Sequence, residues 1–130
     1  MTADTVLPDQ IFYVNRKTLQ DYAEVSGDHN PIHLDEKFAR SVGLPNVIAH
    51  GMLTMALAAE AVRRWADESF SVTDFSTRFT KPVVVPAGTD VALIFSAAVI
   101  SSDENELVFE VTALCNGVKV LGQTKARLTK

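Results

Sequence analysis

Cysteine is nearly absent from this chain of 130 residues: Cys115 stands alone, so no internal disulfide framework can form. The sequence also lacks Gly-x-Gly-x-x-Gly, a phosphate-binding loop and Cys-x-x-Cys, which leaves nucleotide binding and structural zinc without a motif. We therefore expect no cofactor and no metal. Cys115 lies in an alternating apolar pattern and is interpreted as a small packed hydrophobe.

Long apolar runs and basic clusters are missing as well. The longest strongly apolar stretch, near residues 52–62, is well short of a bilayer span, and no basic segment with an apolar run follows Met1. We therefore expect a soluble, cytoplasmic protein. The net charge is −4 and Lys and Arg are scattered, which argues against nucleic acid or a membrane surface as a partner and favours small ligands.

The size and composition favour one compact unit. A chain of 130 residues that is 47% apolar is long enough for one ordinary domain and too short for two. The sequence has no internal repeat and no low-complexity linker. We therefore expect a single domain over residues 1–130.

Helical periodicity dominates the first half of the sequence. A short alternation at 11–14 predicts a strand, and an apolar face over about 17–27 predicts a helix that Gly27 ends. Asp35 is a suitable N-cap for a short second helix. A longer helix is predicted from Gly51 to about residue 68, and because its first half is apolar on nearly every side, we expect that half to be buried.

In the second half of the chain the apolar period changes to two. The predicted strands cover residues 70–81, 89–101, 106–115 and 118–128. Asn116-Gly117 predicts a type I′ hairpin, since both residues tolerate a positive φ, and residues 103–105 predict a second hairpin. About five antiparallel strands and one nearly all-apolar helix can form a core only if the sheet curls round the helix. This predicts an α+β fold with the hot-dog arrangement.

The polar residues best suited to chemistry are concentrated between Ser26 and His33, around a proline. Asp28 and His33 are five residues apart, a separation that would not align them on one helix face. An irregular loop through Pro31 can direct both side chains to one small volume that holds a water. Taken alone, the aspartate would more often be a turn former and the histidine a structural residue.

The segment 22–35, with Gly-Asp-His-Asn-Pro-Ile-His-Leu-Asp at its centre, is followed seventeen residues after His33 by His50-Gly51-Met52. These paired motifs closely resemble the MaoC-like hydratase and dehydratase family, over almost the whole chain. They are most similar to the small (3R)-hydroxyacyl-thioester dehydratases, including the mycobacterial dehydratase B subunit, and to R-specific enoyl-CoA hydratases. The resemblance implies a hot-dog fold, a side-by-side dimer and reversible addition of water to the 2,3 double bond of acyl thioesters in fatty-acid metabolism.

The resemblance places the catalytic aspartate of the family at Asp28 and its histidine at His33. Elimination of a β-hydroxyl needs a base for the α-proton and an acid for the departing hydroxyl, and one water links both tasks. The sequence leaves open which residue carries the proton at each moment. Gly51 is the candidate oxyanion hole, because unpaired N–H groups and the positive end of the helix dipole coincide at the start of the long helix. The resemblance places the oxyanion hole there too.

Supporting roles are assigned to three further residues. Asn30 is expected to fix the loop by hydrogen bonds and to orient the Asp28 carboxylate, with Ser26 supporting the same loop. His50 is interpreted as a residue that caps or positions the start of the long helix. His29 is left outside the site. A zinc site built from the three histidines is conceivable, but their spacing matches none of the usual ligand pairs.

Two other functions stay open beside the dehydratase. A hot-dog acyl-CoA thioesterase would bind the same substrates and polarise the same carbonyl, but it would attack C1 instead of C3. A noncatalytic acyl-binding subunit of a heteromeric dehydratase would only shape the substrate tunnel. The presence of both Asp28 and His33 favours the catalytic hydro-lyase.

The expected partners follow from the fold. An exposed sheet edge and the mouth of a ligand pocket predict a homodimer or a heterodimer with a related hot-dog subunit. The substrate would be an acyl-CoA or acyl-ACP. Acyl carrier proteins are acidic, and five basic residues are candidates for docking one: Arg16, Lys17, Arg40, Arg78 and Lys81.

Overall fold

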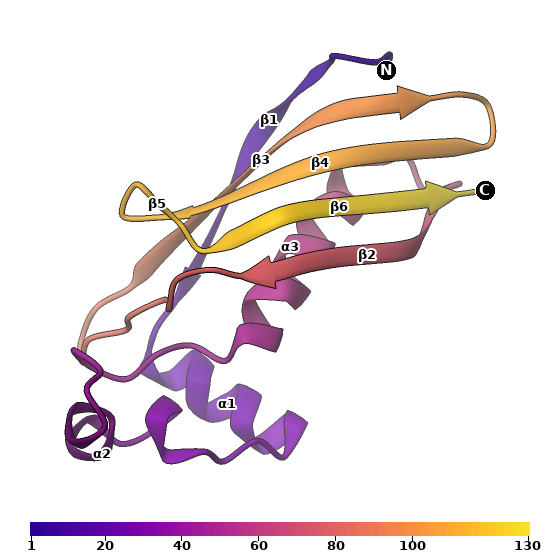
Figure 1. The fold of residues 1–130 in the computed structure, drawn as a ribbon. Coiled ribbons are helices and arrows are strands. Elements are labelled where there is room, and N and C mark those ends of the chain that lie inside the picture. The colour runs from indigo at the N-terminus through magenta and orange to yellow at the C-terminus, as the bar shows by residue number, and fades with distance from the viewer.

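Helices come early in the chain and strands later, apart from the first strand (Figure 1). The computed structural model describes all residues, 1–130. The helical elements are α1 (Arg16–Ser26), the 3-10 turn η1 (Pro31–His33), α2 (Glu36–Ser41) and α3 (Gly51–Trp65). The strands are β1 (Val6–Val14), β2 (Ser71–Phe79), β3 (Val91–Ser102), β4 (Glu106–Cys115), β5 (Val118–Lys119) and β6 (Leu121–Thr129).

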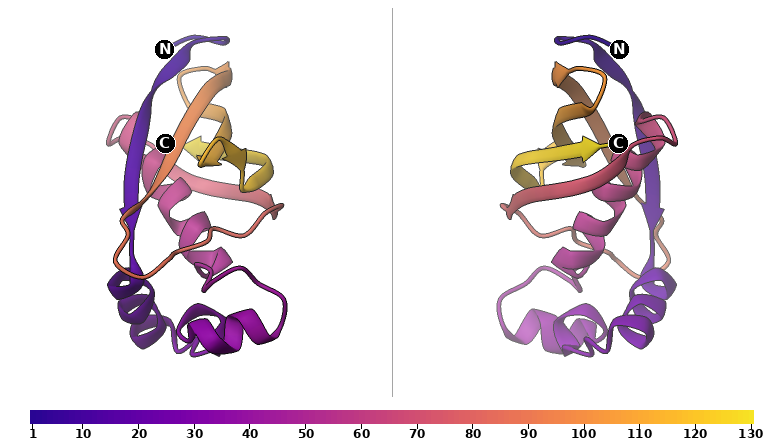
Figure 2. Two further views of the ribbon diagram at one scale, coloured as in Figure 1. Left: turned by 90° about the vertical axis from the view of Figure 1, so that its left-hand side faces the viewer. Right: turned by 90° about the vertical axis from the view of Figure 1, so that its right-hand side faces the viewer.

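The strands form one antiparallel sheet in the order β1-β3-β4-β6-β2, with the short β5 paired to β4. The register shifts within the β1–β3, β2–β6 and β3–β4 pairs, and such irregularities increase the local twist of a sheet. The sheet curls over α3, as the two side views show (Figure 2). This arrangement confirms the predicted α+β hot-dog fold.

The core lies between the sheet and α3. Every second residue of β3 and of most of β4 and β6 is buried, and Phe95 and Phe109 are completely so. From the helix, Leu53, Ala58 and Ala61 are buried against this face. The small alanine side chains let the helix backbone lie close to the strands. This packing fixes where the N-terminus of α3 points.

Both predicted hairpins are confirmed. Asn116 and Gly117 have φ values of 51° and 75°, as a type I′ turn between β4 and β5 requires. In the turn between β3 and β4, the Asp103 carboxylate accepts hydrogen bonds from the N–H groups of Asn105 and Glu106.

Some element boundaries differ from the expectation. β1 is longer and starts at Val6, because Pro8 lies at a register shift on the edge of the sheet, where its missing N–H breaks no ladder bond. The last predicted strand is split into β5 and β6. α3 ends at Trp65, because the carboxylate of Asp67 then forms a turn by accepting from the N–H and hydroxyl of Ser69.

The expectation that the first half of α3 is wholly buried is wrong. Met52 is 57% exposed, Ala56 is also exposed, and Met55 and Ala59 are only partly covered. These four residues share one face of the helix, which we call the open face of α3. The opposite face packs on the sheet. The chain therefore covers only one side of a helix that is apolar on every side. None of the helices combines the length and apolar character that a membrane-spanning segment needs.

Candidate active site

The residues expected to do chemistry lie where α1, η1 and the N-terminus of α3 meet, beyond one end of the sheet (Figure 1). α1 begins with a capping box, in which the Asn15 carboxamide accepts from the Thr18 N–H and the Thr18 hydroxyl accepts from the Asn15 N–H. The helix ends at Gly27, whose φ of 79° is easily reached without a side chain. The chain therefore leaves the helix abruptly, just before Asp28.

Short-range hydrogen bonds hold the loop after α1. The Ser26 hydroxyl accepts from the Asp28 N–H at 3.1 Å. The Asp28 carboxylate accepts from the Asn30 N–H at 3.2 Å, and the Asn30 side chain accepts from the Ile32 N–H at 3.2 Å, which starts η1. Asn30 therefore touches the carboxylate through its main chain, while its side chain caps η1.

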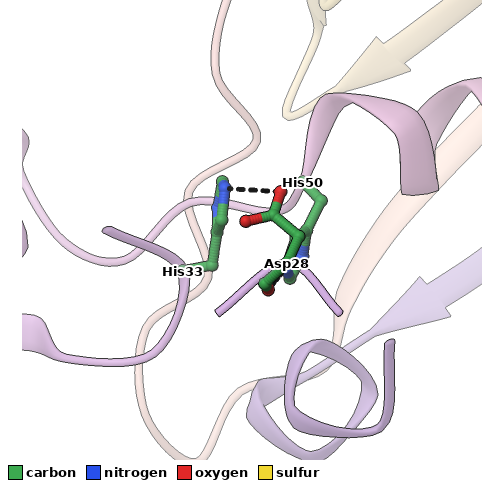
Figure 3. A group of neighbouring side chains, drawn as sticks. All are labelled: Asp28, His33 and His50. Atoms are coloured by element: carbon green, nitrogen blue, oxygen red, sulfur yellow. Dashed lines mark hydrogen bonds and ion pairs between the residues drawn. The ribbon is translucent and has the colours of Figure 1, made fainter. Parts of the chain in front are cut away.

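Asp28 and His33 converge (Figure 3). Nδ1 of His33 lies 2.7 Å from the Ile48 carbonyl, and because a carbonyl only accepts, Nδ1 carries the proton. Nε2 then faces Oδ2 of Asp28 at 4.0 Å. This distance is too long for a direct hydrogen bond, but one oxygen atom fits about 2.8 Å from each. The His33 side chain is 9% exposed and that of Asp28 51%, so the pair lies at the boundary between the interior and solvent.

A short ladder ties His33 to the next part of the chain. The N–H of Ile48 donates to the Ile32 carbonyl at 3.1 Å, and Ile48 pairs with Val84 in an isolated antiparallel bridge. On either side of the bridge, the Ala49 N–H donates to the Val83 carbonyl and the Val85 N–H donates to the Val47 carbonyl, both at 2.9 Å. We call this pairing of residues 47–49 with 83–85 the 48–84 ladder.

The start of α3 lies beside the pair. The N–H of Gly51 donates no hydrogen bond within the chain, as expected in the first turn of a helix. A Cβ at Gly51 would stand 3.2 Å from the ring of Phe79, at the end of β2. The backbone N–H is thus available to a ligand, with an aromatic ring packed beside it.

His50 does not cap α3, contrary to one interpretation drawn from its position. It occupies the N-cap position, but its side chain forms no capping hydrogen bond. Instead, Nε2 lies 3.1 Å from the main-chain carbonyl of Asp28, and the imidazole stacks on that of His33. Burial lowers the pKa of His50, although the hydrogen bond to Asp28 opposes this.

A cavity of about 360 Å³ opens next to His33. It is lined by His33, Ile48, Ala49, Gly51, Thr54, Phe79, Thr80, Lys81, Pro82, Val83, Val120 and Leu121. Asp28 is not among these residues and meets the cavity only through its proximity to His33. Half of the lining residues are apolar, which suits an acyl chain.

Asp28, His33 and His50 also form a group whose ligand atoms lie within 4.8 Å of one another. His29 is not part of it. The two imidazoles are stacked with 25° between their planes, so their in-plane lone pairs lie in nearly parallel planes. In addition, Nδ1 of His33 and Nε2 of His50 are used by main-chain carbonyls. This arrangement does not match the convergent donors of a tetrahedral site.

Sequence reasoning missed the far wall of the cavity. Phe79 is the last residue of β2, Lys81 follows that strand, and Leu121 is the first residue of β6. The sequence predicted a break between the strands at 70–81 and 89–101, but nothing local placed that break beside His33. Sequence reasoning also gave no role at the site to Tyr22, whose ring lies 4.8 Å from that of His50.

Residues 2–114 match a family model described as MaoC like domain. A curated relative, 3-hydroxyacyl-thioester dehydratase X of Mycobacterium tuberculosis, is 41% identical over 81 residues, which cover 62% of this chain and 28% of that protein. A solved MaoC-like dehydratase superposes with a TM-score of 0.93 at 36% identity, over 99% of this chain and 40% of that one. An unliganded R-hydratase from Pseudomonas aeruginosa superposes with a TM-score of 0.87 at 25% identity, over 99% of this chain and 81% of that one.

The chain spans less than half the length of the first two of these proteins. Its match to the family model nevertheless includes the loop with Asp28 and His33, the start of α3 and most of the sheet. The chain belongs to the MaoC-like domain family.

Proposed function

We propose that the protein is a hydro-lyase of fatty-acid metabolism that catalyses the reversible, R-specific hydration of trans-2-enoyl thioesters, and thus acts as a (3R)-hydroxyacyl-thioester dehydratase. The observation that carries the proposal is the 4.0 Å separation of Asp28 Oδ2 and His33 Nε2 beside a cavity that Gly51 also lines. Two groups at this distance can hold the same water. The dehydratase and hydratase named among the relatives support the same reaction class.

In the hydration direction, Asp28 and His33 hold the water. Its oxygen bonds to C3 of the enoyl thioester while one of its protons passes to Nε2 of His33, which is free because Nδ1 already carries a proton. Negative charge then develops on the thioester oxygen, where the N–H of Gly51 stabilises it. The imidazolium of His33 returns a proton to C2. Asp28 orients the water and stabilises the imidazolium, and dehydration follows the reverse path.

We assign the acyl chain to the apolar part of the cavity, beside residues such as Ile48, Val83 and Leu121. The substrate arrives as an acyl-CoA or acyl-ACP, both of which carry phosphate. Lys81 lines the cavity and is not in an ion pair, so it is the candidate contact for that phosphate or for an acidic carrier.

Three of the five basic residues considered for carrier docking are already engaged within the chain. Arg16 donates to the Val85 carbonyl and to the Asn46 side chain, at 2.7 and 2.6 Å. Lys17 pairs with an aspartate one turn later, and Arg40 pairs with Glu36. Arg78 and Lys81 form no such pair and are the better candidates.

We also propose that the open face of α3 pairs with a second copy of the chain or with a related hot-dog subunit. This face starts with Met52 at the N-terminal end of the helix and lies beside the edge strand β2, whose half-exposed Phe79 packs next to Gly51. Met52→Glu should place a charge in that contact and shift the protein to monomer in sedimentation velocity. An unchanged sedimentation coefficient would exclude this face.

The proposed reaction is tested by incubating the purified protein with a short trans-2-enoyl-CoA. We expect the conjugated absorbance to fall without release of free thiol, since water adds at C3 and the thioester stays intact. Thiol release at a comparable rate would instead indicate a thioesterase. If the folded protein stays inactive and only a copurified partner with its own Asp/His pair turns over substrate, the chain is a noncatalytic subunit.

A further inference from the structure

His50 connects three other segments of the site. Its Nε2–H donates to the main-chain carbonyl of Asp28 at 3.1 Å, which reaches back to the loop after α1. Its ring stacks on His33 of η1, with centroids 3.9 Å apart. The ring of Tyr22 in α1 also packs against it, at 4.8 Å and 60°. His50 itself is only 1% exposed, so these contacts are made in the interior.

The contacts of His50 favour a neutral ring. Nδ1 is buried and has no hydrogen-bond partner, so a proton there would be a buried donor without an acceptor. A charge would also lie against His33, which becomes positive when it takes up a proton. The titratable groups that face His50 are Asp28, His29, His33 and Tyr22, and burial outweighs the carboxylate among them, which lowers the pKa of His50.

We propose that His50 is a positioning residue for the Asp28–His33 pair, acting through the hydrogen bond to the Asp28 main chain and through the ring face on which His33 lies. The inference rests on the proposed function, because it affects turnover only if this pair acts on the substrate. His50 touches neither reacting group of the substrate in this scheme. It sets the distance between the Asp28 carboxylate and the His33 imidazole, which act on the substrate.

Asp28 needs such an anchor. Its side chain is half exposed and accepts only one hydrogen bond, from the main chain of Asn30. The position of its carboxylate therefore depends on where the main chain at residue 28 is held. A displacement of about 1 Å in a reacting group can lower a rate by about a hundredfold.

The kinetic test uses two variants that each remove one contact. His50→Phe keeps a ring against His33 but loses the donor to Asp28, and His50→Gln keeps an amide donor of similar reach but loses the ring. We expect His50→Phe to lower kcat by about tenfold to a hundredfold with little change in KM, and His50→Gln to restore part of that loss. His29→Gln is the matched control, because His29 is an exposed imidazole in the same loop, and its turnover should equal that of the unaltered protein.

A readout without substrate separates this inference from the proposed reaction. Long-range proton–nitrogen NMR spectra should show His50 as a neutral ring in the Nε2–H form at neutral pH, with a titration midpoint below the ordinary histidine value. In His50→Phe the ring resonances of His33 at a fixed pH should move, because the ring that stacks on His33 has changed, and in His29→Gln they should not. If the protein shows no hydration of enoyl-CoA but these spectra are observed, the proposed reaction is wrong, and the positioning role of His50 is still supported.

Four results would overturn the inference. One is titration of His50 near its ordinary pKa, and another is protonation of its Nδ1 in the neutral ring. The third is wild-type kcat in both His50 variants, with thermal unfolding showing that they are folded. A higher KM at unchanged kcat would likewise indicate substrate binding rather than positioning.

Discussion

The two ends of α3 use polar groups in opposite ways. At the C-terminal end, Glu60 accepts hydrogen bonds from Arg63 and Arg64, and these bonds lower its pKa to about 2. At the N-terminal end there is no acidic residue in the first turn and no side-chain cap, and the Gly51 N–H has no partner. The C-terminal groups satisfy one another, whereas the N-terminal groups are left for a ligand. We therefore regard the C-terminal end of α3 as structural and the N-terminal end as the one that can take part in the proposed reaction.

The largest expected effect tests whether the residues at the N-terminal end of α3 take part in the reaction. Asp28→Asn and His33→Gln each remove one of the two groups that hold the water, and we expect kcat for a trans-2-enoyl-CoA to fall by about 10²–10⁴-fold. Circular dichroism should show an unchanged fold, because the Asp28 side chain is half exposed and Gln keeps a donor near Ile48. Normal turnover in both variants would remove the distinction between the two ends.

The next effect isolates the free N–H of Gly51. Proline is favourable at the first position of a helix, and the preceding His50, with φ −59° and ψ 133°, already has the conformation that a following proline requires. Gly51→Pro therefore removes the donor while the helix start stays compatible. Gly51→Ala is the control, since it adds the same Cβ against Phe79 but keeps the N–H.

We expect Gly51→Pro to have a kcat about 10²–10³-fold below that of Gly51→Ala in the same enoyl-CoA assay. The ring of Phe79 is 55% exposed and can move away from the new Cβ in both variants. Equal rates for proline and alanine would show that the N–H of Gly51 does not stabilise the transition state.

A smaller effect is expected at the wall beside the helix start. Phe79→Ala removes the ring that packs on Gly51 and widens the cavity there. We expect the preference of kcat/KM to shift towards longer or branched acyl chains by roughly tenfold, the size of effect that a methylene or two has in an apolar pocket. A chain-length series of enoyl-CoA substrates measures this, and an unchanged profile would place the acyl chain elsewhere.

The smallest effect belongs to the C-terminal end. Glu60→Gln removes its exposed ion pairs with Arg63 and Arg64, which should lower the free energy of unfolding by at most about 1 kcal/mol and leave turnover unchanged. Because the pKa of Glu60 is lowered from 4.5 to about 2, its contribution is present above pH 4.5 and is lost as the pH falls towards 2. Denaturant titrations at pH 7 and pH 3 should therefore differ less in Glu60→Gln. A large loss of activity would contradict a purely structural role.

Much of the fold could be predicted because local and global signals agree. Two of the period-two segments form β3 and β4, and Asn116-Gly117 forms the expected turn. The apolar helix is the one over which the sheet curls (Figure 2). The composition of α3, however, could not tell which faces of the helix the sheet covers. A helix that is apolar on every side gives no such signal, so Met52 was misjudged.

The grouping of the candidate residues could be predicted from the sequence only where it is local. The convergence of Asp28 and His33 was predicted because five residues and a proline bring them together in one loop. His50 was misread as a possible cap because its neighbour in sequence is a helix, whereas its hydrogen-bond partner is 22 residues away. Phe79 and Lys81 reach the cavity through strand pairing over longer distances still, which no local pattern reports.

In the 48–84 ladder, main-chain atoms hold the catalytic candidate His33 in place, while side chains of the same residues line the cavity. Its bonds are all made by main-chain atoms, and the Ile48 carbonyl within it also holds Nδ1 of His33. The side chains of Ile48 and Val83, which project from the same residues, line the cavity. Substitutions at these two positions can therefore change the size and shape of an accepted substrate without moving the imidazole. In evolutionary terms, substrate range and reaction chemistry can diverge independently in this scaffold.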